Sequence, residues 1–137
     1  LQVGEYMALS KVENALKKSP YVELPMVYAE STQNHCVALI CPTLPQLESL
    51  AKARGVDPKD VEAMCKNKEI IAEVSKSCLA ACKESKLVSF EIPTKVALVA
   101  DPWTPENDML TAAMKLKRNQ IVARHRDEID ALYGRKK

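Results

Sequence analysis

Cys36-Val37-Ala38-Leu39-Ile40-Cys41 is the stretch from which the fold of this 137-residue chain can be predicted. It is continuously apolar, which indicates a central strand covered on both faces rather than a strand with one face in water. A second apolar run, Lys95-Val96-Ala97-Leu98-Val99-Ala100, is closed by Asp101-Pro102 and predicts another buried strand. Both runs are therefore expected in the interior of the domain.

The segment before the central run predicts a neighbouring strand. Residues 24–30 alternate between two apolar faces, as a strand does. Pro25 has no N–H to give to a sheet, so the beginning of this strand is confined to an edge or an entry position. Ser31-Thr32-Gln33-Asn34 is a short connection, which favours an antiparallel hairpin between this strand and the central one.

Helix-start patterns occur at several places. Ser10-Lys11-Val12-Glu13 has the form of a capping box, in which the serine hydroxyl and the glutamate carboxylate satisfy free amides of a new helix. Ser19-Pro20 is expected to stop that helix. Thr43 predicts a second helix ending before Gly55, and Asp57-Pro58, an N-cap followed by proline, predicts a short third one.

The most periodic helix lies in the middle of the chain. Its apolar positions recur three or four apart: Ile70, Ile71, Val74, Cys78, Ala81 and Cys82. This stripe is expected to be core packed closely on a sheet, not a cofactor site. Near the end, Asn119 is expected to cap a final helix that ends at Gly134, with His125 packed on its apolar side. Arg135-Lys136-Lys137 is expected to be a loose tail.

The order of these elements is mixed, without strict alternation of strand and helix, and predicts one α+β domain over residues 1–137. We expect a compact small domain with a sheet of about three strands and about five packing helices. A short N-terminal strand or hairpin is expected at Val3-Gly4-Glu5-Tyr6-Met7.

The composition is that of an ordinary globular protein, with 47% hydrophobic and 28% charged residues. A net charge of +2 is too small to indicate nucleic acid or an anionic membrane as a partner. The five cysteines include no C-x-x-C, which favours reduced, buried thiols in a cytosolic protein over a metal site. No signal peptide or bilayer-spanning run is found, so we expect the cytoplasm or the cytosolic face of a membrane. The start at Leu1 suggests a piece of a longer protein.

Basic residues concentrate in Leu110-Thr111-Ala112-Ala113-Met114-Lys115-Leu116-Lys117-Arg118. No acid occurs between Asp108 and Asp127. In an extended conformation Lys115 and Lys117 would point to one side and the intervening leucine to the other, so an ammonium would stand on an anchored arm. A solvated basic loop is the alternative, because K-x-K-R alone is a weak signal. The chain has no G-x-G-x-x-G and no P-loop, which places any nucleotide site on another domain.

Two segments together resemble one enzyme family. Gly4-Glu5-Tyr6-Met7-Ala8-Leu9-Ser10-Lys11-Val12-Glu13 resembles the loop after the domain hinge of long-chain fatty-acid CoA ligases, in the AMP-forming adenylate superfamily. Trp103-Thr104-Pro105-Glu106-Asn107-Asp108-Met109-Leu110-Thr111-Ala112-Ala113-Met114-Lys115-Leu116-Lys117-Arg118 resembles that family's C-terminal catalytic stretch, aromatic-T-x-E-N-G-L-L-T-P-T-x-K-L-K-R. Ile129-Asp130-Ala131-Leu132-Tyr133 is also similar, so the resemblance covers almost the whole chain. The chain departs from the family pattern at three positions: Asp108 stands where the family has glycine, Ala112 where it has proline, and Ala113 where it has threonine.

The resemblance implies the C-terminal mobile catalytic domain of an acyl-CoA synthetase, without its hinge and large N-terminal domain. The implied enzyme uses ATP and Mg²⁺, held mainly by that N-terminal domain, to convert a fatty acid to acyl-adenylate and pyrophosphate. The thiol of CoA then displaces AMP. Lys115 matches the adenylation lysine, which would contact the ATP phosphate and the acyl carboxylate. Gly4, Glu5 and Tyr6 match the loop along the path of the CoA thiol.

The resemblance also implies partners: the chain's own N-terminal domain, the fatty acid and CoA. Peripheral membrane association of the full-length enzyme is a further expectation, and nucleic acid is not an expected partner. This chain alone is expected to be inactive.

Two alternatives stay open. One is a ligase of the same superfamily with another acyl acceptor. The other is a non-enzymatic basic module that binds nucleic acid or acidic lipid through residues 115–126, although that segment lacks the aromatic residues that stack on bases.

Overall fold

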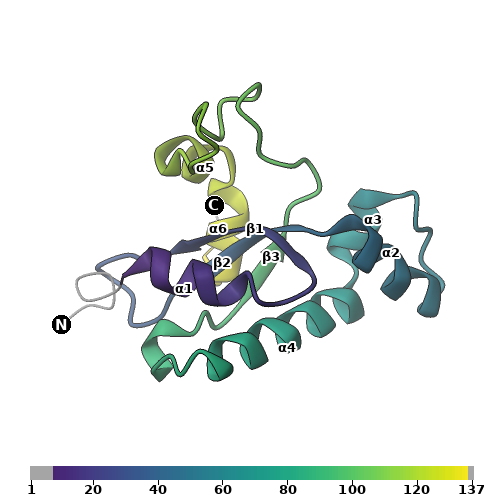
Figure 1. Ribbon diagram of the computed structural model, residues 1–137, viewed down its shortest axis with the longest axis horizontal. Coiled ribbons are helices and arrows are strands. Elements are labelled where there is room, and N and C mark those ends of the chain that lie inside the picture. Colours follow the sequence, from purple (N-terminus) through teal and green to yellow (C-terminus); the bar gives the residue numbers. More distant parts are fainter. Residues whose placement is uncertain (1–7, 136–137) are drawn as a thin grey trace.

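A three-stranded sheet forms the centre of the structure, a computed structural model that describes residues 8–135 (Figure 1). The strands are β1 (Val22–Tyr28), β2 (Val37–Pro42) and β3 (Val96–Leu98), in the order β1-β2-β3. β2 is antiparallel to β1 and parallel to β3. Every residue of β2 is buried, which confirms the central strand predicted from the apolar run.

The edge position predicted for the proline-containing strand is also confirmed. Pro25 lies opposite Ile40 of β2, and within residues 8–135 β1 has no other neighbour in the sheet. A strand at an edge needs only one row of backbone hydrogen bonds, so the missing N–H of proline is tolerated there. The hairpin between β1 and β2 is antiparallel, as the short connection predicted.

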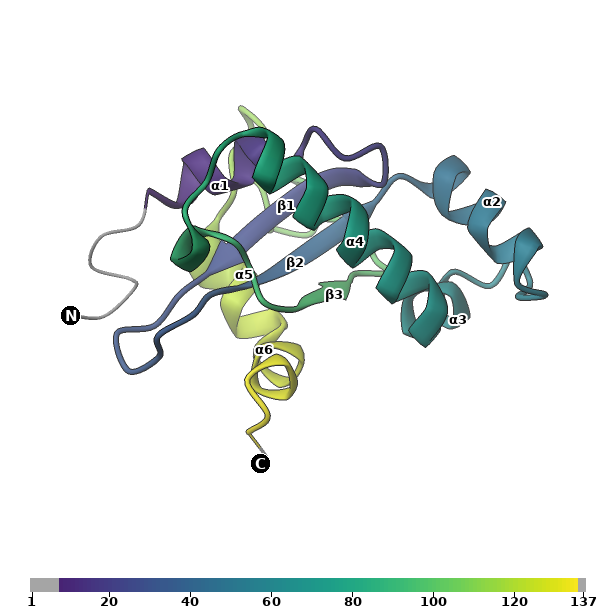
Figure 2. The same ribbon diagram turned by 90° about the horizontal axis from the view of Figure 1, so that it is seen from below.

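Helices cover both faces of the sheet. Seen from below in Figure 2, α1 (Leu9–Leu16) and α4 (Lys68–Glu84) lie across one face. On the opposite face lie α5 (Arg118–Arg124), α6 (Arg126–Leu132) and the segment that connects β3 to α5 (Figure 1). At one end of the sheet are α2 (Leu44–Ala53) and α3 (Val61–Lys66), and a 3-10 turn, η2 (Ser89–Glu91), follows α4.

Each face of the sheet has its own hydrophobic cluster, and β2 supplies both because alternate side chains of a strand point to opposite faces. Ala38 and Ile40 belong to the cluster under α1 and α4. Leu39 and Cys41 belong to the second cluster, whose buried members are Met26, Leu39, Cys41, Val99, Trp103, Met109, Leu110, Ile121 and Ile129. The second cluster therefore joins the sheet to the segment after β3.

The cysteines are part of this core. All five are buried and free, as predicted, and burial raises the pKa of the Cys36, Cys41 and Cys78 thiols to about 12. The stripe on α4 is also core, with only Ile71 partly exposed. Within residues 8–135 no group of three or more His, Cys, Asp or Glu side chains could hold a metal ion. No helix in that part of the chain has the length and apolar character to cross a bilayer.

Several predicted helix caps are wrong, although the helices exist. α1 begins at Leu9, so its serine lies inside the first turn and makes no capping hydrogen bond. Thr43 is the N-cap residue of α2, as predicted, but its side chain caps nothing. The cap of α3 is Asp60, which accepts from the N–H of Ala63 at 3.0 Å, whereas Asp57 accepts from the N–H of Lys59. Gly55 follows α2 with φ +69°, the left-handed conformation expected of a residue after a helix.

The end of the chain differs from the prediction in two ways. The single final helix is two helices, α5 and α6, which meet at His125, so residues 8–135 hold six α-helices rather than about five. Asn119 is inside α5 and is not its cap. Arg135 is not loose, because its guanidinium hydrogen-bonds to Glu30 and Asp130. The N-terminal strand or hairpin expected at residues 3–7 lies outside the described residues. The α+β class is confirmed.

Candidate functional site

The segment that carries the predicted catalytic lysine begins with a tight turn. Trp103 is buried in the second cluster. Directly after it, the amide oxygen of Asn107 accepts from the N–H of Thr104 at 2.9 Å, and the Thr104 hydroxyl accepts from the N–H of Asn107 at 3.1 Å. The Asn107 amide also donates to the carbonyl of Pro102 at 2.9 Å. These residues of the motif therefore shape the base of the segment.

A small hairpin follows this turn and carries Lys115. Leu110 and Leu116 form an antiparallel bridge, and we call residues 110–116 the Lys115 hairpin. The N–H of Thr111 donates to the carbonyl of Lys115 at 2.8 Å, and its hydroxyl accepts from the N–H of Lys115 at 3.1 Å. Met114, at the tip, has φ +66°. Leu116 packs against the second cluster while Lys115 is exposed, the alternation that the sequence predicted.

Asp108 occupies the position where the family pattern has glycine, and the structure explains why glycine suits it. The residue has φ +67°, a conformation that glycine adopts freely and aspartate tolerates better than most residues. The Asp108 carboxylate also forms an ion pair with Lys117. The departures at Ala112 and Ala113 lie at the exposed tip of the hairpin.

The cations near the Lys115 hairpin have different surroundings. Four of them are in ion pairs: Lys117 with Asp108, Arg118 with Glu13, Arg124 with Asp101, and Arg126 with Glu30 and Asp130. The Lys115 ammonium has no hydrogen-bond or ion-pair partner within the described part of the chain. It is therefore the cation of this group that is available to an anion from outside the domain.

Lys115 lies at a surface depression between its hairpin and the first elements of the chain. Ser10 and Asn14 of α1 and Lys17, the residue after α1, line this depression together with Leu24 and Pro25 of β1. A second ammonium, that of Lys17, thus borders the same surface. No pattern in the sequence indicates this neighbour, because Lys17 and Lys115 come together only through the packing of α1 on β1.

Below the depression, an ion pair joins the two predicted site segments. Arg118 donates to both carboxylate oxygens of Glu13, at 2.8 and 2.7 Å, and Glu13 also accepts from the N–H of Val27 at 2.8 Å. Glu13 is only 6% exposed. The carboxylate assigned to a capping box in the sequence therefore anchors the end of the Lys115 hairpin instead.

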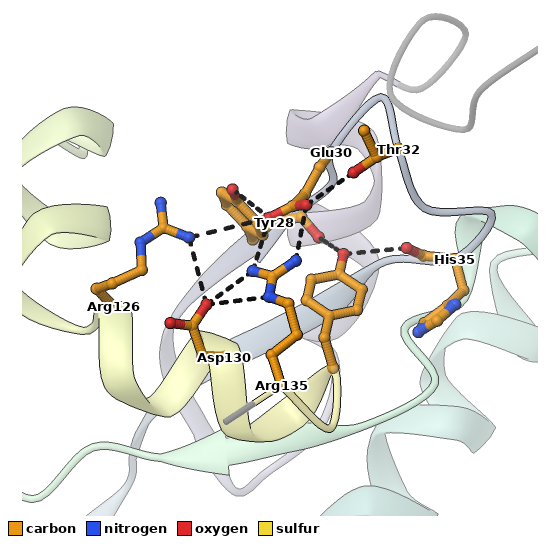
Figure 3. A network of polar contacts seen from close by, with 8 residues as sticks. Tyr28, Glu30, Thr32, His35, Arg126, Asp130 and Arg135 are labelled. Atoms are coloured by element: carbon orange, nitrogen blue, oxygen red, sulfur yellow. Dashed lines mark hydrogen bonds and ion pairs between the residues drawn. The ribbon is translucent and has the colours of Figure 1, made fainter. Parts of the chain in front are cut away.

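A polar network beside the loop between β1 and β2 holds Arg135, the last described residue, in place (Figure 3). Arg135 donates to Glu30 at 2.8 and 2.9 Å and to Asp130 at 2.8 Å, and Tyr28 and Thr32 also donate to Glu30. The hydrogen bonds from Arg135 are the main reason why the pKa of the Glu30 carboxyl is lowered to about 2. Each charge in this network is matched by an opposite one, which is the arrangement of an anchor rather than a binding site.

His125 is a packed residue, as the sequence predicted. It is 5% exposed, and its Nε2 accepts a hydrogen bond from the indole Nε1 of Trp103 at 3.0 Å. The link between these residues could not be read from the sequence, which places them in separate motifs. The remaining predicted site residues, Gly4, Glu5 and Tyr6, lie outside the described residues 8–135.

Comparison with known proteins finds relatives that match almost the whole of this chain. No family model matches the chain. The long chain acyl-CoA synthetase 8 of Arabidopsis thaliana is 44% identical over 134 residues, which are 98% of this chain and 19% of that protein. The fatty acyl-CoA synthetase B of Dictyostelium discoideum is 36% identical over 98% of this chain and 20% of its own length. The chain thus spans about a fifth of the curated relatives it matches.

Solved structures agree in fold. The A domain of carboxylic acid reductase from Segniliparus rugosus, solved in complex with AMP and a co-purified carboxylic acid, superposes with a TM-score of 0.77 at 28% identity, over 93% of this chain and 18% of that one. The adenylation domain of a carboxylate reductase from Mycobacterium chelonae superposes with a TM-score of 0.75 at 26% identity, over the same shares of each chain. Over 98% of its residues this chain is thus homologous to about a fifth of a long-chain acyl-CoA synthetase, and it shares its fold with part of the adenylation domains of carboxylic acid reductases.

Proposed function

We propose that residues 1–137 are the C-terminal mobile domain of a long-chain fatty-acid CoA ligase and that Lys115 is its adenylation lysine. In the first half-reaction a fatty-acid carboxylate oxygen attacks the α-phosphorus of ATP, and pyrophosphate leaves. In the second, the sulfur of CoA attacks the acyl carbon, and AMP leaves. The similarity to acyl-CoA synthetases over 98% of the chain supports this reaction class.

The observation that carries the proposal is the availability of Lys115. Its ammonium stands on a hairpin fixed at both ends, with no side-chain partner among residues 8–135. Bringing a carboxylate to an anionic phosphate is repulsive, and a cation placed between them stabilises the transition state as charge moves from one to the other. A flexible lysine stem on a fixed base suits this role, because the charge can follow both anions.

The loop at Gly4, Glu5 and Tyr6 is assigned to the second half-reaction. Glycine has no side chain, so backbone at that position can approach the narrow pantetheine arm of CoA closely. The domain would swing about a hinge before Leu1, using the lysine in the first half-reaction and this loop in the second. The pair Glu13–Arg118 supports such a rigid movement, because it joins the helix after the loop to the Lys115 hairpin.

Mg²⁺ belongs to the expected chemistry, in which it neutralises phosphate charge, but the described residues do not fit a metal site. No cluster of three or more suitable side chains occurs in residues 8–135. We therefore assign ATP and Mg²⁺ mainly to the N-terminal domain.

CoA is the preferred acyl acceptor in this proposal. The alternative, a superfamily enzyme with another acceptor, has support in the fold similarity to carboxylic acid reductase domains, at 28% identity. The identity to an acyl-CoA synthetase is 44%, and several such enzymes match almost the whole chain. A basic module for nucleic acid or acidic lipid fits less well, because four of the cations in and near residues 115–126 are already in ion pairs.

Five buried, free thiols suit a reducing compartment, so we place the enzyme in the cytoplasm or on the cytosolic face of a membrane, with peripheral association of the full-length protein as an accompanying proposal.

The full-length enzyme tests the proposal. With ATP and a long-chain fatty acid it should release pyrophosphate, and on addition of CoA it should form acyl-CoA and AMP. A version ending before Leu1 should bind ATP but lose both half-reactions, whereas residues 1–137 alone should neither bind ATP tightly nor turn over fatty acid. Micromolar ATP affinity of residues 1–137 in calorimetry, or full activity without them, would contradict the assignment.

A further inference from the structure

A buried contact closes the base of the segment that presents Lys115. Trp103 donates from its indole Nε1 to Nε2 of His125 at 3.0 Å, and the rings meet edge to face with centroids 5.9 Å apart. Trp103 is 2% exposed and His125 5%. The two residues are 22 positions apart, and Lys115 lies between them. Both ends of the segment are therefore tied together within the core.

The hydrogen bonds also determine the state of the histidine ring. An indole N–H can only donate, so Nε2 of His125 must carry a free lone pair. Nδ1 lies 2.5 Å from a carboxylate oxygen of Glu128, and an ionised carboxylate can only accept. The ring proton is therefore on Nδ1, and Glu128 holds His125 in the tautomer that accepts from Trp103.

The contact is connected to Lys115 from both directions along the chain. On one side, the turn after Trp103 leads to Leu110, which shares the second cluster with Trp103 and forms one half of the bridge in the Lys115 hairpin. On the other side, the hairpin leads into α5, which ends at His125. The Trp103–His125 contact is thus connected to Lys115 through packed or hydrogen-bonded elements.

We propose that Trp103, His125 and Glu128 are positioning residues for the adenylation half-reaction: they fix where Lys115 meets its anionic partners without touching substrate. This inference rests on the role proposed above for Lys115. A catalytic charge is most effective when the backbone that carries it is held in place beforehand, and a displacement of about 1 Å can cost on the order of 10²-fold in rate.

Four variants of the full-length enzyme test this role, each assayed for pyrophosphate release and for acyl-CoA formation from supplied acyl-adenylate. Trp103→Phe removes the donor and His125→Leu the acceptor, and each should slow adenylation roughly 10²-fold while leaving the second half-reaction nearly unchanged. His125→Gln should recover most of the rate, because its amide oxygen can accept near the position of Nε2. Tyr133→Phe is the matched control: it removes a 3.0 Å hydrogen bond to the carbonyl of His35 beside the same cluster and should leave adenylation unchanged.

Lys115→Ala, assayed beside these variants, separates the inference from the proposed function. Slow adenylation in Lys115→Ala but normal adenylation in Trp103→Phe and His125→Leu would overturn the positioning role alone. Normal adenylation in Lys115→Ala would overturn the proposed function itself. Positioning is also overturned if Trp103→Phe and His125→Leu lose both half-reactions equally, if Tyr133→Phe loses as much adenylation, or if His125→Gln is as slow as His125→Leu, since each result indicates general damage to the fold.

Discussion

Arg118, which follows the Lys115 hairpin, donates two hydrogen bonds to the carboxylate of Glu13, a residue 105 positions earlier in the chain. The pair connects the basic segment after β3 with α1, the helix that follows Gly4, Glu5 and Tyr6 in the sequence. Because the Glu13 carboxylate is buried and also accepts from the backbone of β1, it joins three elements at one point. The helix α1 and the segment that carries Lys115 are thus held together by this ion pair.

This ion pair predicts a stability effect. Glu13→Gln keeps an acceptor for the N–H of Val27 but removes the charge that binds Arg118. Hydrogen bonds to charged groups contribute about 1.5–3 kcal/mol, so the free energy of unfolding of this chain in urea should fall by about that amount. Glu23→Gln, an exposed change on β1, is the control and should cost less than about 0.5 kcal/mol. Equal effects of the two changes would show that the pair contributes nothing.

Glu30 predicts how stability changes with acid. Hydrogen bonds from Arg135 hold the pKa of this carboxyl at about 2 in the folded chain, against an ordinary value of 4.5. Because the folded-state pKa is the lower one, the carboxylate stabilises the fold fully above 4.5 and loses this effect as the pH falls toward 2. The stability difference between wild type and Glu30→Gln should therefore shrink between about pH 6 and about pH 2.5. A difference that stays constant in urea titrations over this range would contradict the network in Figure 3.

The buried thiols predict slow chemical labelling. Burial raises the pKa of Cys65 to about 11 and that of Cys36, Cys41 and Cys78 to about 12, so little reactive thiolate is present near neutral pH. A disulfide reagent should modify all five cysteines in urea and essentially none in the native chain within the same time. Leu79→Cys, at a position 41% exposed, should add one rapidly labelled thiol as the control. Rapid labelling of the native wild-type chain would show that the reagent reaches the core.

The strands were predictable because their signal is local. The apolar run before Pro42 can be buried on both faces only in the middle of a sheet, and Pro25 fits only an edge strand. The periodic stripe on α4 likewise needs no knowledge of distant residues. The fold class and the antiparallel pairing of β1 with β2 follow from such patterns, whereas the parallel pairing of β2 with β3 was not predicted.

The helix caps and the candidate site depend on contacts between residues far apart in sequence. Such contacts were predicted wrongly or were not predicted. The capping box at Glu13 was wrong because Arg118 and the β1 backbone compete for the same carboxylate. The final helix breaks at His125, whose ring binds Trp103 across 22 positions. Lys115 could be singled out by resemblance, but its lack of a partner among the residues that the structure describes follows only from seeing which acids pair with its neighbours.

Gly4 predicts a separation of the two half-reactions. In the full-length enzyme Gly4→Leu should obstruct the approach of the CoA thiol through its added side chain. Pyrophosphate release should stay close to normal, acyl-adenylate should accumulate, and little acyl-CoA should form. Gly4→Ala, a smaller addition, should reduce acyl-CoA formation less. If pyrophosphate release fell as far as acyl-CoA formation, the loop would not be specific to the second half-reaction.

The most direct test compares Lys115→Ala with Lys117→Ala in the full-length enzyme at one salt concentration. Removing a preorganised electrostatic donor costs about 10²–10³-fold in rate, so Lys115→Ala should slow pyrophosphate release by at least that factor and still form acyl-CoA from supplied acyl-adenylate. Lys117→Ala should be milder, because its ammonium is paired with Asp108. Equal loss of adenylation in the two variants, or loss of both half-reactions in Lys115→Ala, would contradict the assignment of Lys115 as the adenylation lysine.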